Sequence, residues 1–173
     1  MPNHVKNVLT FRNLKSEDKR FILDTIASAK EEGGHRIDFD KIIPEPRTKE
    51  ECPEDCIVNK DSHVSPIEEK PWFDWYVWRN KYWGTKWGAY DCYTTTTDTT
   101  VIFIFETAWS LAYPVITKLP LLGYKFDIRW ADEDWGSNCG KITFSREQGW
   151  QEAWEKAAYK NPRQFAERLW NKY

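Results

Sequence analysis

Hydrophobic and polar residues alternate along five segments of the chain, and this period of two predicts five β-strands. We expect them at residues 3–13, twice within the hairpin-like segment 89–107, and at 124–134 and 139–146. Residues 101–106, VIFIFE, are apolar on both sides of their strand. Such a strand is typical of the centre of a sheet that is covered on both faces.

A period of three to four residues predicts helices between these strands. Ser16 is a favourable N-cap for a first helix, and Gly33-Gly34 is a favourable place for that helix to end. Two stripes of tryptophan and tyrosine predict a second helix within residues 71–83. A short helix is expected at 113–119, with Pro114 near its start.

Two capping patterns predict helices at the end of the chain, at about residues 146–173. Ser145 and Gln148 form a capping box that would open a helix carrying Trp150 and Trp154. Asn161, followed by Pro162, would open the last helix.

The predicted order is strand, helix, strand, strand, helix, strand, then further elements. This order is that of the split βαβ arrangement, so the fold class is α+β, with a ferredoxin-like antiparallel sheet and helices packed on it. We interpret residues 1–173 as a single domain. Its appendages are the terminal helices and an acidic, proline-punctuated insert at about 44–71, in which Ser65 to Glu68 resembles a further capping box.

Composition narrows the function classes. The chain has 173 residues, a formal net charge of −2 and a sequence pI of about 6.0, which disfavours a general binder of duplex DNA but leaves room for a local basic patch. No segment is long and apolar enough to cross a membrane, and the opening MPNHVKNVLTF has no cleavable apolar run. We therefore expect a protein of the bacterial cytoplasm, with its four cysteines reduced.

Three motifs carry a resemblance to a known family: WGTKWGAYD at 83–91, FETAWSLAYPVI at 105–116 and WADEDWGSNCGKI at 130–142. Together with the opening MPNHV, they resemble the YubB-like ferredoxin-like domain family of phage and plasmid proteins. The resemblance implies a ferredoxin-like fold in a mobile-element protein and implies no catalytic residues. The acidic insert with Cys52 and Cys56 departs from the family pattern, as does LAYP where a double proline is common.

The candidates for metal chemistry are incomplete. Cys52 and Cys56, followed by His63, have one close pair of zinc ligands but no second pair, and an exposed loop with incidental thiols is the simpler interpretation. Asp132 and Asp134 could converge on a divalent cation, although a solvated turn accounts for them as well.

The sequence also lacks the common nucleophile, phosphate-loop, dinucleotide and metalloprotease motifs. We therefore predict no enzyme activity, no catalytic residue, no metal and no cofactor. His4, near the first strand, is interpreted as a packed or surface residue.

Eleven tryptophans exceed what one small core normally holds, so some indole rings are expected to face outward and bind a partner. The candidate residues form an aromatic and basic contact patch, consisting of Trp78, Arg79, Trp83, Lys86 and Trp87. For Trp83 and Trp87, packing of the helix end onto the sheet is the simpler interpretation. An acidic patch in the insert, consisting of Glu50, Glu51, Glu54 and Asp55, could meet a basic partner.

The sequence thus predicts a non-catalytic accessory protein of a phage or plasmid that binds a host protein or protein complex and inhibits a host defence complex, such as a CRISPR or restriction effector. The alternatives are a module that binds single-stranded nucleic acid, for which aromatic rings interleaved with cations are typical, and, less favoured, a metal-dependent hydrolase.

Overall fold

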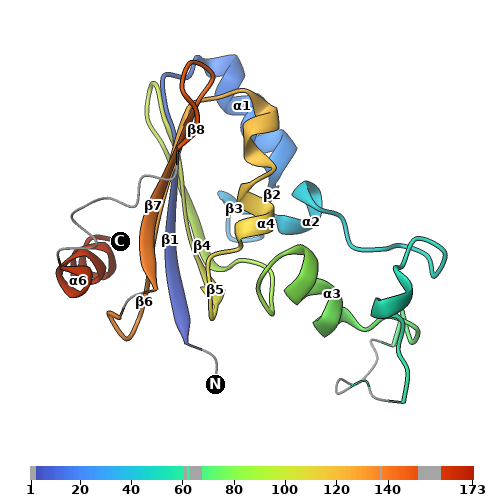
Figure 1. The fold of residues 1–173 in the computed structure, drawn as a ribbon. Coiled ribbons are helices and arrows are strands. Elements are labelled where there is room, and N and C mark those ends of the chain that lie inside the picture. The colour runs from blue at the N-terminus through green and yellow to red at the C-terminus, as the bar shows by residue number, and fades with distance from the viewer. Residues whose placement is uncertain (1–2, 61, 63–67, 137, 152–160) are drawn as a thin grey trace.

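The computed structural model describes residues 3–60, 62, 68–136, 138–151 and 161–173. Figure 1 shows one twisted sheet seen nearly edge-on, with most helices on one side and the C-terminal helix on the other. No helix among these residues combines the length and the apolarity that crossing a membrane requires.

The sheet has six strands in the order β4-β5-β1-β6-β7-β8, and every neighbouring pair is antiparallel. The strands are β1 (His4–Phe11), β4 (Tyr90–Thr96), β5 (Val101–Ala108), β6 (Phe126–Asp132), β7 (Cys139–Ser145) and β8 (Gly149–Gln151). The five predicted strands are all present, and β8 is an addition.

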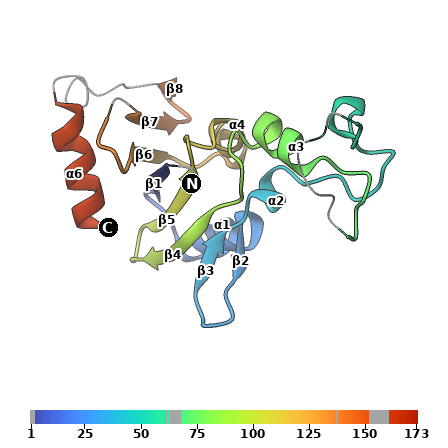
Figure 2. The same ribbon diagram turned by 90° about the horizontal axis from the view of Figure 1, so that it is seen from below.

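The fold class is ferredoxin-like α+β, as predicted. The four core strands lie in the order β4-β5-β1-β6, so β5 separates β1 from β4, and β1 separates β5 from β6. This is the split βαβ arrangement, because a helical connection joins each separated pair. The strands β7 and β8 then extend the sheet beyond β6 (Figure 2).

One face of the sheet carries the main core. Several helices cover this helical face: α1 (Ser16–Ile26), α2 (Phe39–Ile42), α3 (Trp75–Tyr82), α4 (Tyr113–Ile116) and the 3₁₀ helices η1 (Glu54–Cys56) and η2 (Leu119–Leu122). The polar Asn7 lies among the apolar side chains of β1 on this face. Its amide Nδ2 donates to the Val5 carbonyl at 2.8 Å and to Thr107 Oγ1 at 2.9 Å, which offsets the cost of its burial.

The opposite face is covered by α6 (Pro162–Lys172). Asn161 caps this helix as predicted, because its Oδ1 accepts from the Gln164 backbone amide at 3.0 Å. The buried residues under α6 form a second, smaller cluster, comprising Val8, Ile104, Ala131, Cys139, Ala166 and Leu169. Because Ile104 belongs to this cluster and Phe103 to the main core, β5 is covered on both faces, as its sequence predicts.

The prediction for the end of the first helix is wrong. The helix α1 ends at Ile26, and the chain continues into a hairpin of β2 (Ala27–Ala29) and β3 (His35–Ile37). Gly33 and Gly34, with φ of 93° and 79°, form the hairpin turn instead of the helix end. Both roles require a left-handed backbone, so the glycine pair alone does not distinguish them. The cap residue of α1 is Lys15 instead of Ser16.

The capping box at Ser145 also has a different outcome. Ser145 Oγ does accept from the Gln148 backbone amide at 3.1 Å, but this bond closes the turn between β7 and β8. Gly149 has a φ of 67°, which favours a turn over a helix here. The side chain of Trp150, Trp154 and the remainder of that predicted helix lie outside the described residues.

The described part of the insert packs against the α3 region. The Val58 amide donates to the Trp72 carbonyl at 2.9 Å, and the Asp74 amide donates to the Cys56 carbonyl at 2.9 Å. These bonds fix η1 beside the start of α3. The predicted capping box from Ser65 onward falls on residues that lie outside the described part, apart from Glu68.

Candidate anion-binding site beside the C-terminal helix

Trp78 and Trp83 of the predicted aromatic patch are buried, with 3% and 4% of their surface exposed. Trp78 stacks on Tyr82 with ring centroids 5.0 Å apart, and Trp83 Nε1 donates to the Ile43 carbonyl at 2.9 Å. The expectation that these two rings face outward is therefore wrong, because they fill the core beneath α3.

Arg79 is engaged within the chain. Its Nε donates to Glu45 Oε1 at 2.6 Å, and its guanidinium lies 5.2 Å from the ring centroids of both Trp75 and Trp83. This cation therefore joins the insert to α3 and is not displayed for a partner.

The remaining members of that patch, Lys86 and Trp87, are partly exposed. The Lys86 ammonium lies 4.9 Å from the Trp87 ring centroid and 5.6 Å from that of Trp109. Trp109 is 41% exposed and has a φ of 69°, which is a strained conformation for a bulky side chain. The sequence did not single out Trp109, because nothing in its local pattern reveals a left-handed backbone.

The acidic patch is displayed in part. Glu50, Glu51 and Glu54 are exposed, whereas Asp55 accepts from Lys81 Nζ at 2.6 Å. This hydrogen bond lowers the pKa of the Asp55 carboxyl.

The two candidate metal sites gain no support. Cys52 and Cys56 are buried instead of exposed, and burial, helped by the neighbouring Asp55, raises the pKa of the Cys56 thiol to about 12. His63 lies outside the described residues. Asp132 accepts from the Gly136 amide, whereas Asp134 accepts from the Asn3 side chain. Across the described ranges, no group of three His, Cys, Asp or Glu side chains is placed to hold a metal ion.

His4 belongs to a polar network at one end of the sheet. Its Nδ1 lies 2.8 Å from the Tyr90 hydroxyl and 3.6 Å from Glu106 Oε2. Burial raises the pKa of the Glu106 carboxyl, although the nearby Lys6 and His4 oppose this shift. The network lies on the α6 face of the sheet, where the Lys6 ammonium lies 4.5 Å from the ring centroid of Trp170 on α6.

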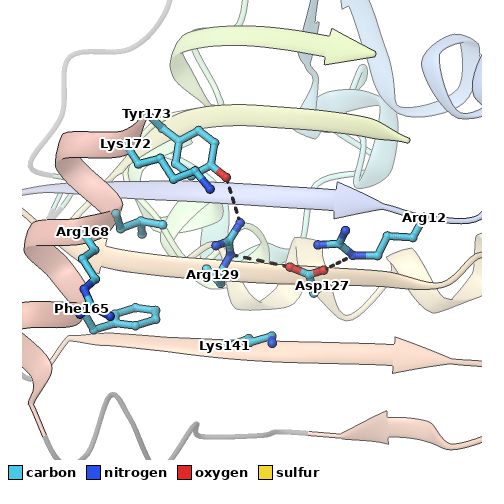
Figure 3. A pocket seen from close by; sticks show the side chains of 9 residues that line it. Arg12, Asp127, Arg129, Lys141, Phe165, Arg168, Lys172 and Tyr173 are labelled. Carbon is cyan, nitrogen blue, oxygen red and sulfur yellow. Dashed lines mark hydrogen bonds and ion pairs between the residues drawn. The ribbon is translucent and has the colours of Figure 1, made fainter. Parts of the chain in front are cut away.

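A basic pocket lies toward the other end of that face, between α6 and the strands β1, β6 and β7 (Figure 3). The cavity has a volume of about 350 Å³. It is lined by five cationic side chains, one carboxylate and two aromatic rings, together with Leu169: Arg12, Arg129, Lys141, Arg168, Lys172, Asp127, Phe165 and Tyr173.

The topology brings these side chains together from distant parts of the sequence. Asp127 and Arg129 are two residues apart on β6 and therefore share a face. Lys141 is the register partner of Arg129 on β7, and Arg12 directly follows β1. Arg168 and Lys172 are four residues apart on α6, so they project from the same side of the helix.

Asp127 holds two of the cations in place. Its Oδ1 accepts from Arg12 Nε at 2.7 Å, and its Oδ2 lies 3.7 Å from Arg129 Nε. The other end of the Arg129 guanidinium donates to the Tyr173 hydroxyl at 3.3 Å. Although burial opposes the shift, this hydrogen bond and the charge of Arg129 lower the pKa of the Tyr173 phenol.

The pocket is prepared for an anion. Arg129 Nε is buried and makes no hydrogen bond to any of the described residues, although Asp127 Oδ2 lies 3.7 Å from it. Among the described residues that line the pocket, Asp127 is the one carboxylate beside five cations. A phosphate, sulfate or carboxylate group is the chemistry that such a set of arginines and lysines binds.

Sequence reasoning missed this pocket. Each cation occupies an ordinary solvent-side position of a strand or helix, and only the three-dimensional arrangement collects them. The i, i+4 pair of Arg168 and Lys172 on the helix opened by Asn161 was the one local signal available.

Comparison with known proteins finds a similarity in one part of the chain. Residues 86–171 match a family model described as a ferredoxin-like domain in Api92-like protein. This segment includes β4 to β8 and most of α6, and therefore Asp127, Arg129, Lys141 and Arg168 of the pocket. No curated protein and no solved structure matches the chain.

Proposed function

We propose that this chain is a non-catalytic binding protein of a phage or plasmid, related to the YubB-like proteins, and that the macromolecule it binds is a single-stranded nucleic acid. The observation that carries the proposal is the basic pocket, in which five cations surround one carboxylate beside α6. The proposal places a backbone phosphate of the strand in this pocket.

The arrangement of the arginines supports a phosphate ligand. Arginine presents several donors in a planar group and can bind two phosphate oxygens at once, whereas lysine acts as a point charge. Arg129 is held from two sides, by Asp127 and Tyr173, so little side-chain freedom is lost when it binds. Lys141, Arg168 and Lys172 add positive potential around it.

The rings and the pocket size favour a single strand over a duplex. Phe165 and Tyr173 lie beside the cations, and stacking of bases on aromatic rings next to basic groups is typical of single-strand binding. The volume of about 350 Å³ lies near the lower end of the range of about 300–1,000 Å³ seen for small-ligand sites. A cavity of this size suits one nucleotide better than the flank of a double helix.

The overall charge of −2 is compatible with this proposal because the cations are concentrated locally. Charge density at the site, and not the net charge of the chain, determines the attraction of a phosphate backbone within a screening length of about 8–10 Å.

The test is a binding measurement with matched variants. Fluorescence anisotropy of a labelled oligothymidylate should show binding that weakens with added salt, as counterion release requires. Arg129→Ala should weaken binding at least about tenfold, which is the loss expected for a charged hydrogen bond. Arg20→Ala is the control, because Arg20 lies on α1 with its side chain 86% exposed and forms an ion pair with Asp24. Equal affinities for both variants would contradict the proposal.

A second candidate function is binding to a host protein complex, such as a CRISPR or restriction effector. The observation that favours it is the exposed Trp109, whose strained backbone holds an indole at the surface beside Lys86 and Trp87. Exposed tryptophans are frequent anchors of protein interfaces. If Trp109→Ala abolishes co-purification of a host complex and Arg129→Ala does not, this candidate replaces the first.

A further inference from the structure

A second cavity adjoins the basic pocket, and Arg12 lines both. This neighbouring cavity, which we call the loop pocket, has a volume of about 270 Å³. It lies where three connections meet at one end of the sheet, and it is lined by Arg12, Asn13, Gly123, Tyr124, Lys125, Ser145, Arg146 and Glu147.

The loop pocket is built by specific backbone geometry. The Arg12 amide donates to the Lys125 carbonyl at 3.0 Å, which joins the end of β1 to the segment before β6. Gly123 has a φ of 75°, and a Cβ atom at this position would collide with the Arg146 guanidinium. The absence of a side chain at Gly123 therefore leaves room for the guanidinium of the exposed Arg146 beside the loop before β6.

The two pockets have the same chemical composition. Each contains cations, at least one aromatic ring and one carboxylate. In the loop pocket the cations are Arg12, Lys125 and Arg146, the ring is Tyr124 and the carboxylate is Glu147. The Tyr124 hydroxyl donates to Asp18 Oδ1 at 3.1 Å, which fixes the ring at the pocket wall.

Arg12 is placed to contact a ligand in either pocket. Its Nε is taken by Asp127, and its side chain is 44% exposed. Its two terminal nitrogens make no hydrogen bond to the described residues, so they can donate to a ligand.

We infer that the basic pocket and the loop pocket bind successive nucleotides of one strand, with Arg12 between their phosphates. A ligand whose chemistry repeats from unit to unit explains why cations, ring and carboxylate occur twice side by side. This inference rests on the proposed function and specifies its ligand: an oligonucleotide, bound across the ends of β1, β6 and β7, and not a mononucleotide.

The test compares oligothymidylates of two and six nucleotides, both without terminal phosphates, by fluorescence anisotropy, with the intact chain at several salt concentrations. The dimer then carries a single phosphate and can occupy the phosphate position of only one pocket. The six-mer should bind the wild type at least about tenfold more tightly than the dimer, which corresponds to one added charged contact. Arg146→Ala should remove most of this gain, leave dimer binding within about twofold, and lower the salt slope for the six-mer by about 0.7, the value for one phosphate contact on a single strand.

Lys125→Ala provides a second test on the adjoining loop, and Arg20→Ala again serves as the control for a lost surface cation. The control should keep the full gain in affinity from two to six nucleotides. A gain that Arg146→Ala and Lys125→Ala also keep is the purely statistical advantage of the longer strand. Arg12→Ala should weaken the binding of both lengths, because Arg12 contributes to both pockets.

The outcomes separate this inference from the proposed function. If both lengths bind equally well, or if Arg146→Ala and Lys125→Ala keep the gain with length, the inference is wrong and the single basic pocket stands. If neither oligonucleotide binds the wild type, the proposed function fails and this inference fails with it.

Discussion

The two faces of the sheet are covered differently. We assign most of the stability to the helical face and ligand binding to the α6 face. The helical face buries large side chains under several helices, including Phe11, Phe39, Phe73, Phe103, Phe105 and Phe126. The α6 face buries a small cluster under a single helix that crosses the strands (Figure 2). This face also carries the polar network of His4 at one end and the basic pocket toward the other.

The larger buried side chains of the helical face explain why this face contributes more to stability than the α6 face. The rings of the helical face contact one another, as Phe39 does with Phe105 and Trp83 at centroid distances of 5.9 Å. Aromatic pairs of this kind add to the apolar area that they bury. On the α6 face the buried side chains are mostly smaller, and Arg12, Asp127 and Arg129 occupy the space where further apolar side chains would otherwise lie.

The largest effect should come from the helical face. Phe105→Ala removes a fully buried ring and should lower the free energy of unfolding by about 3–5 kcal/mol. Urea denaturation followed by circular dichroism measures this loss. A loss below about 1 kcal/mol would show that packing on the helical face contributes little to the free energy of unfolding.

A smaller loss is expected under α6. Leu169→Ala removes a buried side chain from the second cluster and should cost about 2–3 kcal/mol, toward the low end for leucine, because the helix edge can relax. Hydrogen exchange should show the amides of α6 opening while those of β1 and β5 stay protected. Equal acceleration in all three elements would mean that the two faces unfold as one unit.

Cysteine labelling compares the two faces within one molecule. Cys92 belongs to the helical face and Cys139 to the α6 face, and both are buried. Iodoacetamide should label Cys139 at least about tenfold faster than Cys92 in the native protein, since opening α6 requires less free energy than global unfolding. Peptide mass spectrometry gives the two rates, and faster labelling of Cys92 would reverse the assignment of stability to the faces.

The pH dependence follows from the raised pKa of Cys92. Burial raises the pKa of this thiol from its ordinary value of 9.0 to about 12. The unfolded chain therefore loses the proton first, so the contribution of the thiol is fully present below about pH 9 and is lost between pH 9 and 12.

The loss amounts to about 1.4 kcal/mol for each pH unit in that window. Cys92→Ala lacks this titration, so the difference in unfolding free energy between wild type and variant should shrink from pH 8 to pH 10.5. Denaturation at both pH values measures it, and a constant difference would contradict the burial of Cys92.

The smallest effect should come from the charge balance of the basic pocket. Asp127→Asn removes the one carboxylate and should strengthen oligonucleotide binding by about threefold, or about 0.7 kcal/mol, at low salt. The gain is small because Asp127 also positions Arg12 and Arg129. Glu167→Gln, on the outer side of α6, is a matched control and should change affinity less.

The fold was largely predictable because local patterns determine it. Alternation identified β1, β4, β5, β6 and β7, and the Asn161 cap located α6. The errors fell where one local signal fits two structures, as with Gly33-Gly34, which closes a hairpin instead of ending a helix. The bond between Ser145 and Gln148 is a similar case, because it closes a turn.

The site was not predictable by the same means. The sequence favours Trp78 and Trp83 as contacts, yet both are core residues, since burial depends on what α3 packs against. The basic pocket depends on the register of Arg129 with Lys141 and on the path of α6 across the sheet. Neither feature is encoded in any short segment.

The most direct measurement is an amide and arginine side-chain NMR titration of the protein with an oligothymidylate of six nucleotides. The account predicts chemical-shift changes at Arg12, Arg129, Lys141, Arg168 and Lys172, with the side-chain Nε signal of Arg129 among the largest. Shifts confined to Trp109, Lys86 and Trp87, or no shifts at saturating oligonucleotide, would contradict it.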